Sequence, residues 1–223
     1  MAETLTYDRR TPKTKHAGLA AAMFGDYFRR VPAGQTVLNV AAGTTELARD
    51  LEAWRIPAVP VISVDPLYRT NGWYVNRRDR VPATAEDMPF DDNSFALTLC
   101  QFGLQHMLDR PAAVREMVRV TKSAEGADNS ATGTILLNPV FKPGPLWEAL
   151  TLRGLRDVCT VQAPLARVTA REALPTLVIR KTPDLTSERL ETLITTLTET
   201  QAMQRRRTLG ERIARAWGGY PSI

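Results

Sequence analysis

Short apolar runs alternate with helix-like segments along residues 1–140, and this alternation limits the fold more than any other feature of the sequence. Strands are predicted over residues 36–40, 59–64, 81–85, 95–100 and 134–140, and helices over residues 19–30, 46–54 and 110–121. Strands that alternate with helices are joined by right-handed crossovers, so they pair in parallel. The pattern therefore predicts a doubly wound α/β fold around a mostly parallel sheet.

The first predicted strand runs directly into a loop and a helix, and residues 37–48 read V-L-N-V-A-A-G-T-T-E-L-A. In nucleotide-binding α/β folds this loop carries several glycines, because a bare backbone lets a ligand approach closely. Only Gly43 is a glycine here. It is a candidate ligand-binding residue, and a plain turn glycine is the alternative.

Asp65 is the candidate with the clearest position, because it ends the second predicted strand. Ligands of open α/β sheets bind outside the carboxyl ends of the strands. The alternative is a structural role, in which Asp65 caps a helix that begins at Pro66. Gln101, at the tip of the fourth strand, is expected to line the same pocket.

The charge and the distribution of apolar residues argue against a membrane protein, a secreted protein and a metal-binding protein. The net charge is +5, and no apolar run reaches the roughly 18 residues of a membrane helix. The first ten residues lack the apolar core of a secretory signal, and the two cysteines form no metal-ligand pattern. We therefore expect a cytoplasmic protein that does not associate with membranes.

Arginines interleave with aromatic residues over 68–80 and recur at 205–207, which suggests nucleic-acid binding as an alternative activity. A solvated surface in a protein from a G+C-rich genome explains the same arginines, so nucleic acid is not the favoured partner. The acidic pairs at 86–87 and 91–92 flank Met-Pro-Phe, which favours a turn, and no metal site is expected.

Two segments together resemble the class I S-adenosylmethionine-dependent methyltransferases of the type 11 group. The first is the strand, loop and helix at 37–48. The second reads A-E-D-M-P-F-D-D-N-S-F at 85–95, and it is followed by L-Q-H-M at 104–107 and R-E-M-V-R-V-T-K at 115–122. The resemblance covers roughly residues 15–140 and implies a Rossmann-like methyltransferase fold.

The resemblance also implies roles for individual residues in holding S-adenosylmethionine. Asp65 would accept hydrogen bonds from the two ribose hydroxyls, since a carboxylate can accept several at once. Asn39 stands where the family has an acidic residue that orients the loop and the methionine part. The remaining positions of the implied cofactor pocket are Ala41, Gly43, Thr45, Thr84, Ala85, Glu86 and Gln101, with Ala41 and Thr45 in place of glycines and Thr84 at the adenine amino group.

The resulting hypothesis is methyl transfer from S-adenosylmethionine to an oxygen, nitrogen or carbon atom of a small-molecule acceptor. His106 follows the fourth strand and is the candidate general base, with a structural role as its alternative. The rival hypothesis is a pseudoenzyme of the same fold that binds a partner subunit or RNA, or catalyses another reaction. Residues 1–140 are expected to form the core with its N-terminal helix.

Residues 141–223 are expected to complete the fold as a largely helical extension and to offer a surface for a protein partner. Helices are predicted there over residues 146–158 and within 186–217, with one short strand at 177–180.

Overall fold

A single mixed sheet organises the computed structural model, which describes residues 19–43, 47–69, 77–124, 130–138, 143–162 and 176–200. Its seven strands lie in the order β3-β2-β1-β4-β5-β7-β6. Strands β1 to β5 pair in parallel, β7 pairs antiparallel with β5, and β6 pairs antiparallel with β7. The strand bounds are β1 Val37–Val40, β2 Val61–Val64, β3 Arg80–Val81, β4 Leu97–Gln101, β5 Thr134–Asn138, β6 Cys159–Gln162 and β7 Thr176–Arg180.

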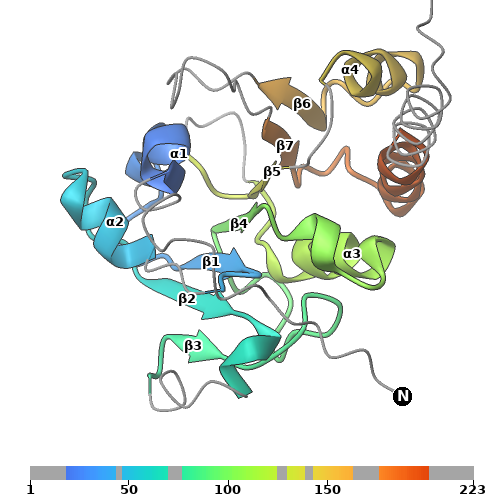
Figure 1. The fold of residues 1–223 in the computed structure, drawn as a ribbon. Coiled ribbons are helices and arrows are strands. Elements are labelled where there is room, and N and C mark those ends of the chain that lie inside the picture. The colour runs from blue at the N-terminus through green and yellow to red at the C-terminus, as the bar shows by residue number, and fades with distance from the viewer. Residues whose placement is uncertain are drawn as a thin grey trace, which may run out of the picture.

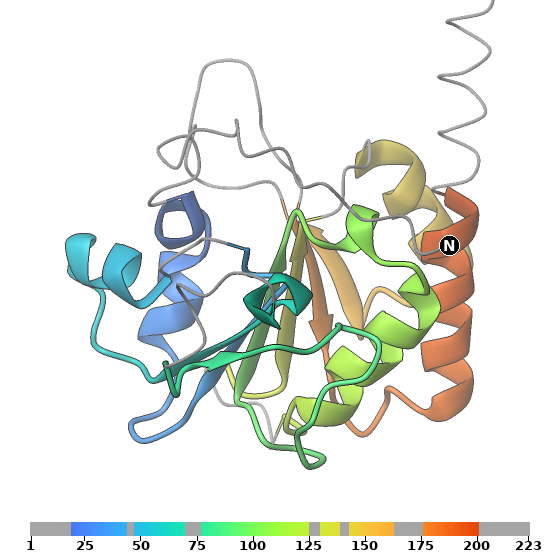
Figure 2. The same cartoon turned by 60° about the horizontal axis from the view of Figure 1, so that its bottom comes forward.

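Helices cover both faces of this sheet (Figures 1 and 2). Figure 2 shows α1 and α2 on one side, and α3, α4 and the helix at residues 187–200 on the other. Two short 3₁₀ turns, η1 and η2, follow β2 and β4. The bounds are α1 Leu19–Arg29, α2 Leu47–Ala53, η1 Pro66–Arg69, η2 Leu104–His106, α3 Arg110–Val120 and α4 Pro143–Leu152. The predicted doubly wound α/β fold is confirmed.

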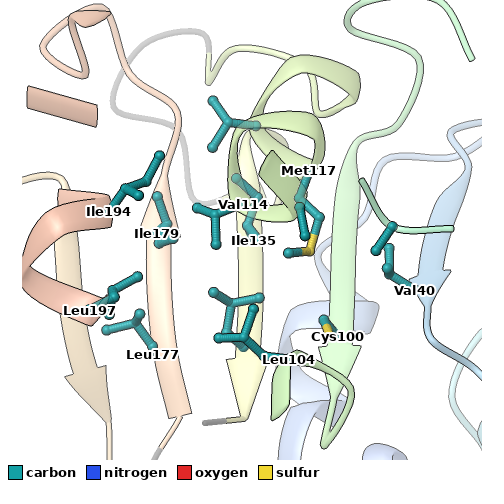
Figure 3. Close-up of a cluster of buried hydrophobic side chains, with 14 of the residues drawn as sticks. Val40, Cys100, Leu104, Val114, Met117, Ile135, Leu177, Ile179, Ile194 and Leu197 are labelled. Carbon is teal, nitrogen blue, oxygen red and sulfur yellow. The ribbon is translucent and has the colours of Figure 1, made fainter. Parts of the chain in front are cut away.

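The two faces of the sheet divide the core because successive strand residues point to opposite sides. In β5, Ile135 and Leu137 face the cluster under α3, while Leu136 faces the cluster under α1 and α2. Figure 3 shows the first cluster, in which β5, β7, α3 and the helix at 187–200 contribute apolar side chains. The helix at 187–200 therefore belongs to the same hydrophobic core as the parallel strands.

Helix α3 begins where the sequence predicts it. Asp109 caps it by accepting a hydrogen bond from the Ala112 amide at 2.9 Å, and Pro111 occupies the first turn. Its buried face contains Ala113, Val114, Met117, Val118 and Val120. These residues form the apolar stripe through which the helix packs against the sheet.

The sequence-based bounds differ from the structure most at β3, α4 and β6, and by one or two residues at the ends of β2 and β4. The third strand was predicted over 81–85, but β3 is only Arg80–Val81, because Pro82 has no amide hydrogen to continue the ladder. Helix α4 ends at Leu152 rather than at 158, since Gly154 adopts a left-handed φ of 63° after the helix. Strand β6 was not predicted, and of the segment 186–217 the structure describes only the part up to residue 200.

Candidate functional site

The carboxyl ends of β1 and β4 lie side by side at the point where the strand order reverses. From β1 the chain proceeds to β2 and β3 on one side, and it then returns to β4 and β5 on the other. Open α/β sheets bind their ligands at such a switch point, outside the carboxyl ends of the strands, and this place is called the crevice below. The candidate site consists of residues 41–43 after β1, residues 102–104 after β4 and the neighbouring end of β2.

Of the four described non-glycine residues with a left-handed φ, two lie at this crevice, and the other two, Arg55 and Asn93, lie in turns elsewhere. Ala41 after β1 and Phe102 after β4 have φ values of 52° and 56°, in the left-handed region that disfavours residues with a β-carbon. Gly43 adopts the same region at 54° without that cost. Strained residues persist where the surroundings fix them, and they cluster at binding sites. The strain at Ala41 and Phe102 is therefore consistent with a binding site at this crevice.

The buried Asp65 carboxylate connects this crevice to the end of β2. Its Oδ2 accepts a hydrogen bond from the Gly43 amide at 2.7 Å, and its Oδ1 accepts one from the Leu67 amide at 2.9 Å. Burial raises the pKa of Asp65 above its ordinary value, while these two amides act in the opposite direction. Asp65 thus caps η1, as the structural alternative predicts, and it also fixes the turn at Gly43.

Each Asp65 oxygen keeps acceptor capacity for a ligand. An ionised carboxylate offers about four lone-pair positions, and the two amide bonds occupy one on each oxygen. The loop is held independently by the Ala42 amide, which donates to the Val64 carbonyl at 3.1 Å. Asp65 can therefore accept further hydrogen bonds without releasing the loop.

The loops after β1 and β4 touch each other through Ala41 and Gly103. A β-carbon placed on Gly103 would lie 2.4 Å from the Ala41 β-carbon and 2.9 Å from the Cys100 Sγ. No side chain fits at Gly103 at these distances. The Ala41 methyl group therefore packs against the bare backbone of Gly103.

The second segment of the resemblance is joined to the start of α3. Ala85 is buried and Thr84 is exposed. The Glu86 Oε1 accepts hydrogen bonds from the Leu108 amide at 2.9 Å and the Asp109 amide at 3.3 Å. Glu86 thus holds the block against the loop before α3, a structural role that the resemblance did not indicate.

Arg119 of α3 fixes the rest of this block. Its guanidinium donates to the Glu116 carboxylate at 2.5 and 2.7 Å and to Asp92 at 2.6 Å. It also donates to the carbonyls of Met88 and Phe90, at 3.2 and 2.8 Å. Asp92 and the carbonyls of Met88 and Phe90 are therefore held against α3 by the Arg119 guanidinium. Among the described residues, no group of three or more metal-ligating side chains gathers.

The other predicted residues occupy distinct positions around the crevice. Asn39 is buried in β1, and Gln101 is half-buried at the end of β4. The Gln101 Nε2 is buried and has no hydrogen-bond partner among the described residues. The His106 side chain is exposed in η2, and Thr45 lies outside the described residues. The structure thus brings Ala41, Gly43 and Asp65 together through direct contacts or neighbouring backbone, with Gln101 at the adjacent strand end.

Sequence reasoning missed Gly103, Phe102 and Arg119. The F-G pair directly after the fourth strand was a visible signal, since a glycine at a strand end often marks a close approach of two backbones. Nothing in the sequence shows that Phe102 adopts a left-handed φ. Arg119 falls within the resembling segment. Apart from Glu116, however, its hydrogen-bond partners lie at least 27 residues earlier in the sequence, so the sequence does not reveal them.

Comparison with known proteins identifies the central part of the chain. Residues 38–124 match the model of the methyltransferase domain family. The ubiquinone/menaquinone biosynthesis C-methyltransferase UbiE of Stenotrophomonas maltophilia is 37% identical over 103 residues, which is 42% of this chain and 40% of that protein. UbiE of Hahella chejuensis is 34% identical over 101 residues, 41% of each chain. The matches thus span about two fifths of the length of these relatives, and they confirm the resemblance that the two sequence segments indicated.

Solved structures resemble the chain at lower identity. The YcgJ protein from Bacillus subtilis has a TM-score of 0.45 and 20% sequence identity, over 66% of this chain and 70% of that one.

In the described part of this chain, no helix has the length and apolar character needed to cross a membrane.

Proposed function

We propose that this chain, a class I methyltransferase by the domain at residues 38–124, transfers a methyl group from S-adenosylmethionine to a small-molecule acceptor. The observation that carries the proposal is the Asp65 carboxylate, buried at the carboxyl end of β2 beside the strained loops of the crevice. A vicinal diol such as that of ribose offers two hydroxyl donors, and a carboxylate with capacity on both oxygens is its natural partner.

The residues at the crevice fit the nucleoside part of this cofactor. Asp65 supplies acceptors for the ribose hydroxyls, and the buried Gln101 Nε2 supplies a donor for an acceptor atom of the ligand. Bound S-adenosylmethionine provides a sulfonium-linked methyl group that a nucleophile can displace. The protein then needs mainly to bind and orient the two reactants, because alignment supplies much of the rate enhancement.

The acceptor is proposed to be a small organic molecule, methylated at oxygen, nitrogen or carbon. The relatives are named as C-methyltransferases of quinone biosynthesis, which supports an acceptor of this size. His106 is the proposed proton acceptor, because it lies in η2, directly beyond the end of β4. A phenol, enol or amine acceptor would lose its proton to such a base as the methyl group is transferred.

A second candidate function is ligand binding or partner binding without methyl transfer. The observation that favours it is Ala41, which carries a β-carbon at a φ of 52° and packs it against Gly103, where the resemblance implies a glycine. Such a protein would act as a subunit, with a partner bound through residues 141–223, or as an RNA-binding protein, or it would catalyse a different reaction.

Isothermal titration with S-adenosylhomocysteine, the demethylated product, tests the leading proposal. We expect saturable binding, and we expect Asp65→Asn to weaken it by roughly 10-fold or more, since hydrogen bonds to a charged group contribute about 1.5–3 kcal/mol. Glu52→Gln is the matched control, because it removes the same charge from an exposed position on α2. Absence of binding at millimolar ligand would exclude the methyltransferase proposal.

A further inference from the structure

We infer that the polar side chains of Gln101, Asn138 and Thr176 together bind an oxygen atom of the methyl acceptor. Gln101 ends β4, Asn138 ends β5 and Thr176 begins β7, and these three strands lie next to one another in the sheet. The three residues are called the polar row below. The inference rests on the proposed function and adds the chemical class of the acceptor, a carbonyl compound or a phenolate.

The strand register places the polar row on a single face of the sheet. Gln101 lies opposite Asn138 in the parallel pair of β4 and β5. The antiparallel register of β5 and β7 pairs Leu137 with Leu177, so Asn138 and Thr176 are the next residues of that ladder. Their side chains are in contact, since the Asn138 Nδ2 donates a hydrogen bond to the Thr176 Oγ1 at 3.2 Å. Residues that pair across neighbouring strands point to the same face, so the row continues over three strands.

The adjoining row on the same face is apolar. It consists of Leu99, Leu136 and Val178, which pair with one another and belong to the cluster under α1 and α2. Asn138 and Thr176 are as deeply buried, at 2% and 4% exposed, yet they carry an amide and a hydroxyl group. Buried polar groups are costly unless they form hydrogen bonds. The change from apolar to polar residues at this edge therefore favours a role in binding over a role in packing.

The Gln101 amide supplies a donor that a ligand can use. Its Nε2 atom is buried and forms no hydrogen bond with any residue in the described ranges. An amide nitrogen has two hydrogens to donate, so one can serve the cofactor and the other the acceptor. A buried donor without a partner lowers stability, and a ligand oxygen removes that cost when it binds. The ligand atom must therefore accept a hydrogen bond.

The place of the polar row in the sheet assigns this atom to the methyl acceptor. The strand order puts β4, β5 and β7 on one side of β1, whereas Asp65 ends β2 on the other side. A carbonyl or an ionised hydroxyl is an oxygen that accepts hydrogen bonds and donates none. Donors at this oxygen favour the ionised form of a phenol or an enol, which makes the oxygen or the adjacent carbon more nucleophilic.

Thermal unfolding of the full chain without ligand tests the unpartnered donor. We expect Gln101→Met to keep the wild-type midpoint or to raise it by up to about 4 °C, because it removes that donor and retains the side-chain length. Gln35→Met is the matched control. The Gln35 Oε1 accepts a hydrogen bond from the Lys122 Nζ, so its replacement should lower the midpoint. A lower midpoint in Gln101→Met would show that the folded protein needs this amide and would overturn the inference.

A pair of probes tests recognition of the oxygen. Acetophenone and ethylbenzene differ in a carbonyl oxygen, and their dissociation constants are measured by NMR titration of the full chain without cofactor. We expect the ratio of the acetophenone constant to the ethylbenzene constant to rise about 3–10-fold in Gln101→Met and to stay unchanged in Gln35→Met. No binding of acetophenone, an unchanged ratio in Gln101→Met, or an equal change in both variants overturns the inference.

This result is separable from the fate of the proposed function, because cofactor binding is measured on its own with S-adenosylhomocysteine. If S-adenosylhomocysteine binds and the probe ratio does not change, the proposed function stands and the polar row is wrong. If the ratio changes but S-adenosylhomocysteine does not bind, the proposed function is wrong, and with it the assignment of the ligand as a methyl acceptor. Binding of S-adenosylhomocysteine together with the expected change in the ratio supports both.

Discussion

Ala41 and Gly103 show how a single methyl group shapes the site. Ala41 adopts a left-handed φ of 52°, which costs a residue with a β-carbon about 1–2 kcal/mol. Gly103 has an ordinary φ of −86°, so its lack of a side chain is explained by contact and not by conformation. Gly103 is thus required because a side chain there would clash with Ala41, whereas Ala41 is the residue that adopts the unfavourable backbone conformation.

We predict strong coupling between these two positions. Gly103→Ala alone should destabilise the protein by about 2 kcal/mol or more, because its new β-carbon would lie 2.4 Å from that of Ala41. The double variant with Ala41→Gly should recover part of that loss, with a coupling energy of about 1 kcal/mol. Urea unfolding of the four proteins measures the cycle, and additive effects would show that the two residues do not touch.

Asp65 is predicted to make stability depend on pH in a direction opposite to that of most acidic residues. Burial raises its pKa in the folded state above the ordinary value of 3.8. The folded protein then binds more protons than the unfolded chain between these two pKa values, so this group lowers stability as pH rises through that window. The stability of Asp65→Asn relative to wild type should therefore increase with pH from below 4 and then become constant. A relative stability that falls with pH would contradict this assignment.

Asp65 was also predictable from sequence as a site residue, because a single acidic residue directly after a buried strand is a local signal. Gly103 and Phe102 were not, since their roles depend on the contact between loops that lie about 60 residues apart in the sequence. The left-handed φ of Ala41 was equally hidden. A residue that is marked by its own place at a strand end can thus be proposed from sequence, whereas a residue whose environment depends on a distant segment cannot.

At the scale of elements, Arg119 and Glu116 connect α3 to the loop before β4. Glu116 accepts two hydrogen bonds from Arg119 and one from the Met88 amide at 3.0 Å. The Arg119 guanidinium lowers the pKa of Glu116, so this pair stabilises the protein above the ordinary value of 4.5, and the contribution is lost as pH falls through the lowered pKa. The loop that carries the family motif is thus held by α3 and not by its own turns alone.

We predict that Arg119→Ala destabilises the protein by about 2 kcal/mol or more, because it leaves the half-buried Glu116 carboxylate without its charged partner. Arg115→Ala is the matched control on the same helix. Its partner Glu191 is exposed, and exposed ion pairs contribute little. Chemical unfolding of both variants at pH 7 provides the measurement, and equal effects would show that Arg119 acts only as a surface charge.

At the scale of the whole molecule, the matched domain is not a complete core. The family model ends at residue 124, yet β5, β7 and the helix at 187–200 bury their apolar side chains in the cluster under α3 (Figure 3). Leu177, Ile179, Leu193, Ile194 and Leu197 are each 5% exposed or less. The alternation of strands and helices made the parallel strands predictable, whereas β6 was missed because four residues with no clear flanking turn give a weak signal.

A chain truncated after residue 142 should therefore fail to fold cooperatively. It would expose Ile135 and Leu137 of β5, which are 1% and 0% exposed in the full chain. We expect a broad thermal transition and binding of a hydrophobic dye, whereas the full chain should unfold in one sharp transition. A sharp transition in the truncated chain would show that residues 143–200 form a dispensable addition.

The most direct test of the central claim is a crystal structure with S-adenosylhomocysteine bound. We predict the ribose hydroxyls within hydrogen-bond distance of the Asp65 carboxylate and the base toward Thr84, at the outer side of β2. A ligand bound away from Asp65, or a ribose held by other residues while Asp65 contacts only Gly43 and Leu67, would contradict it.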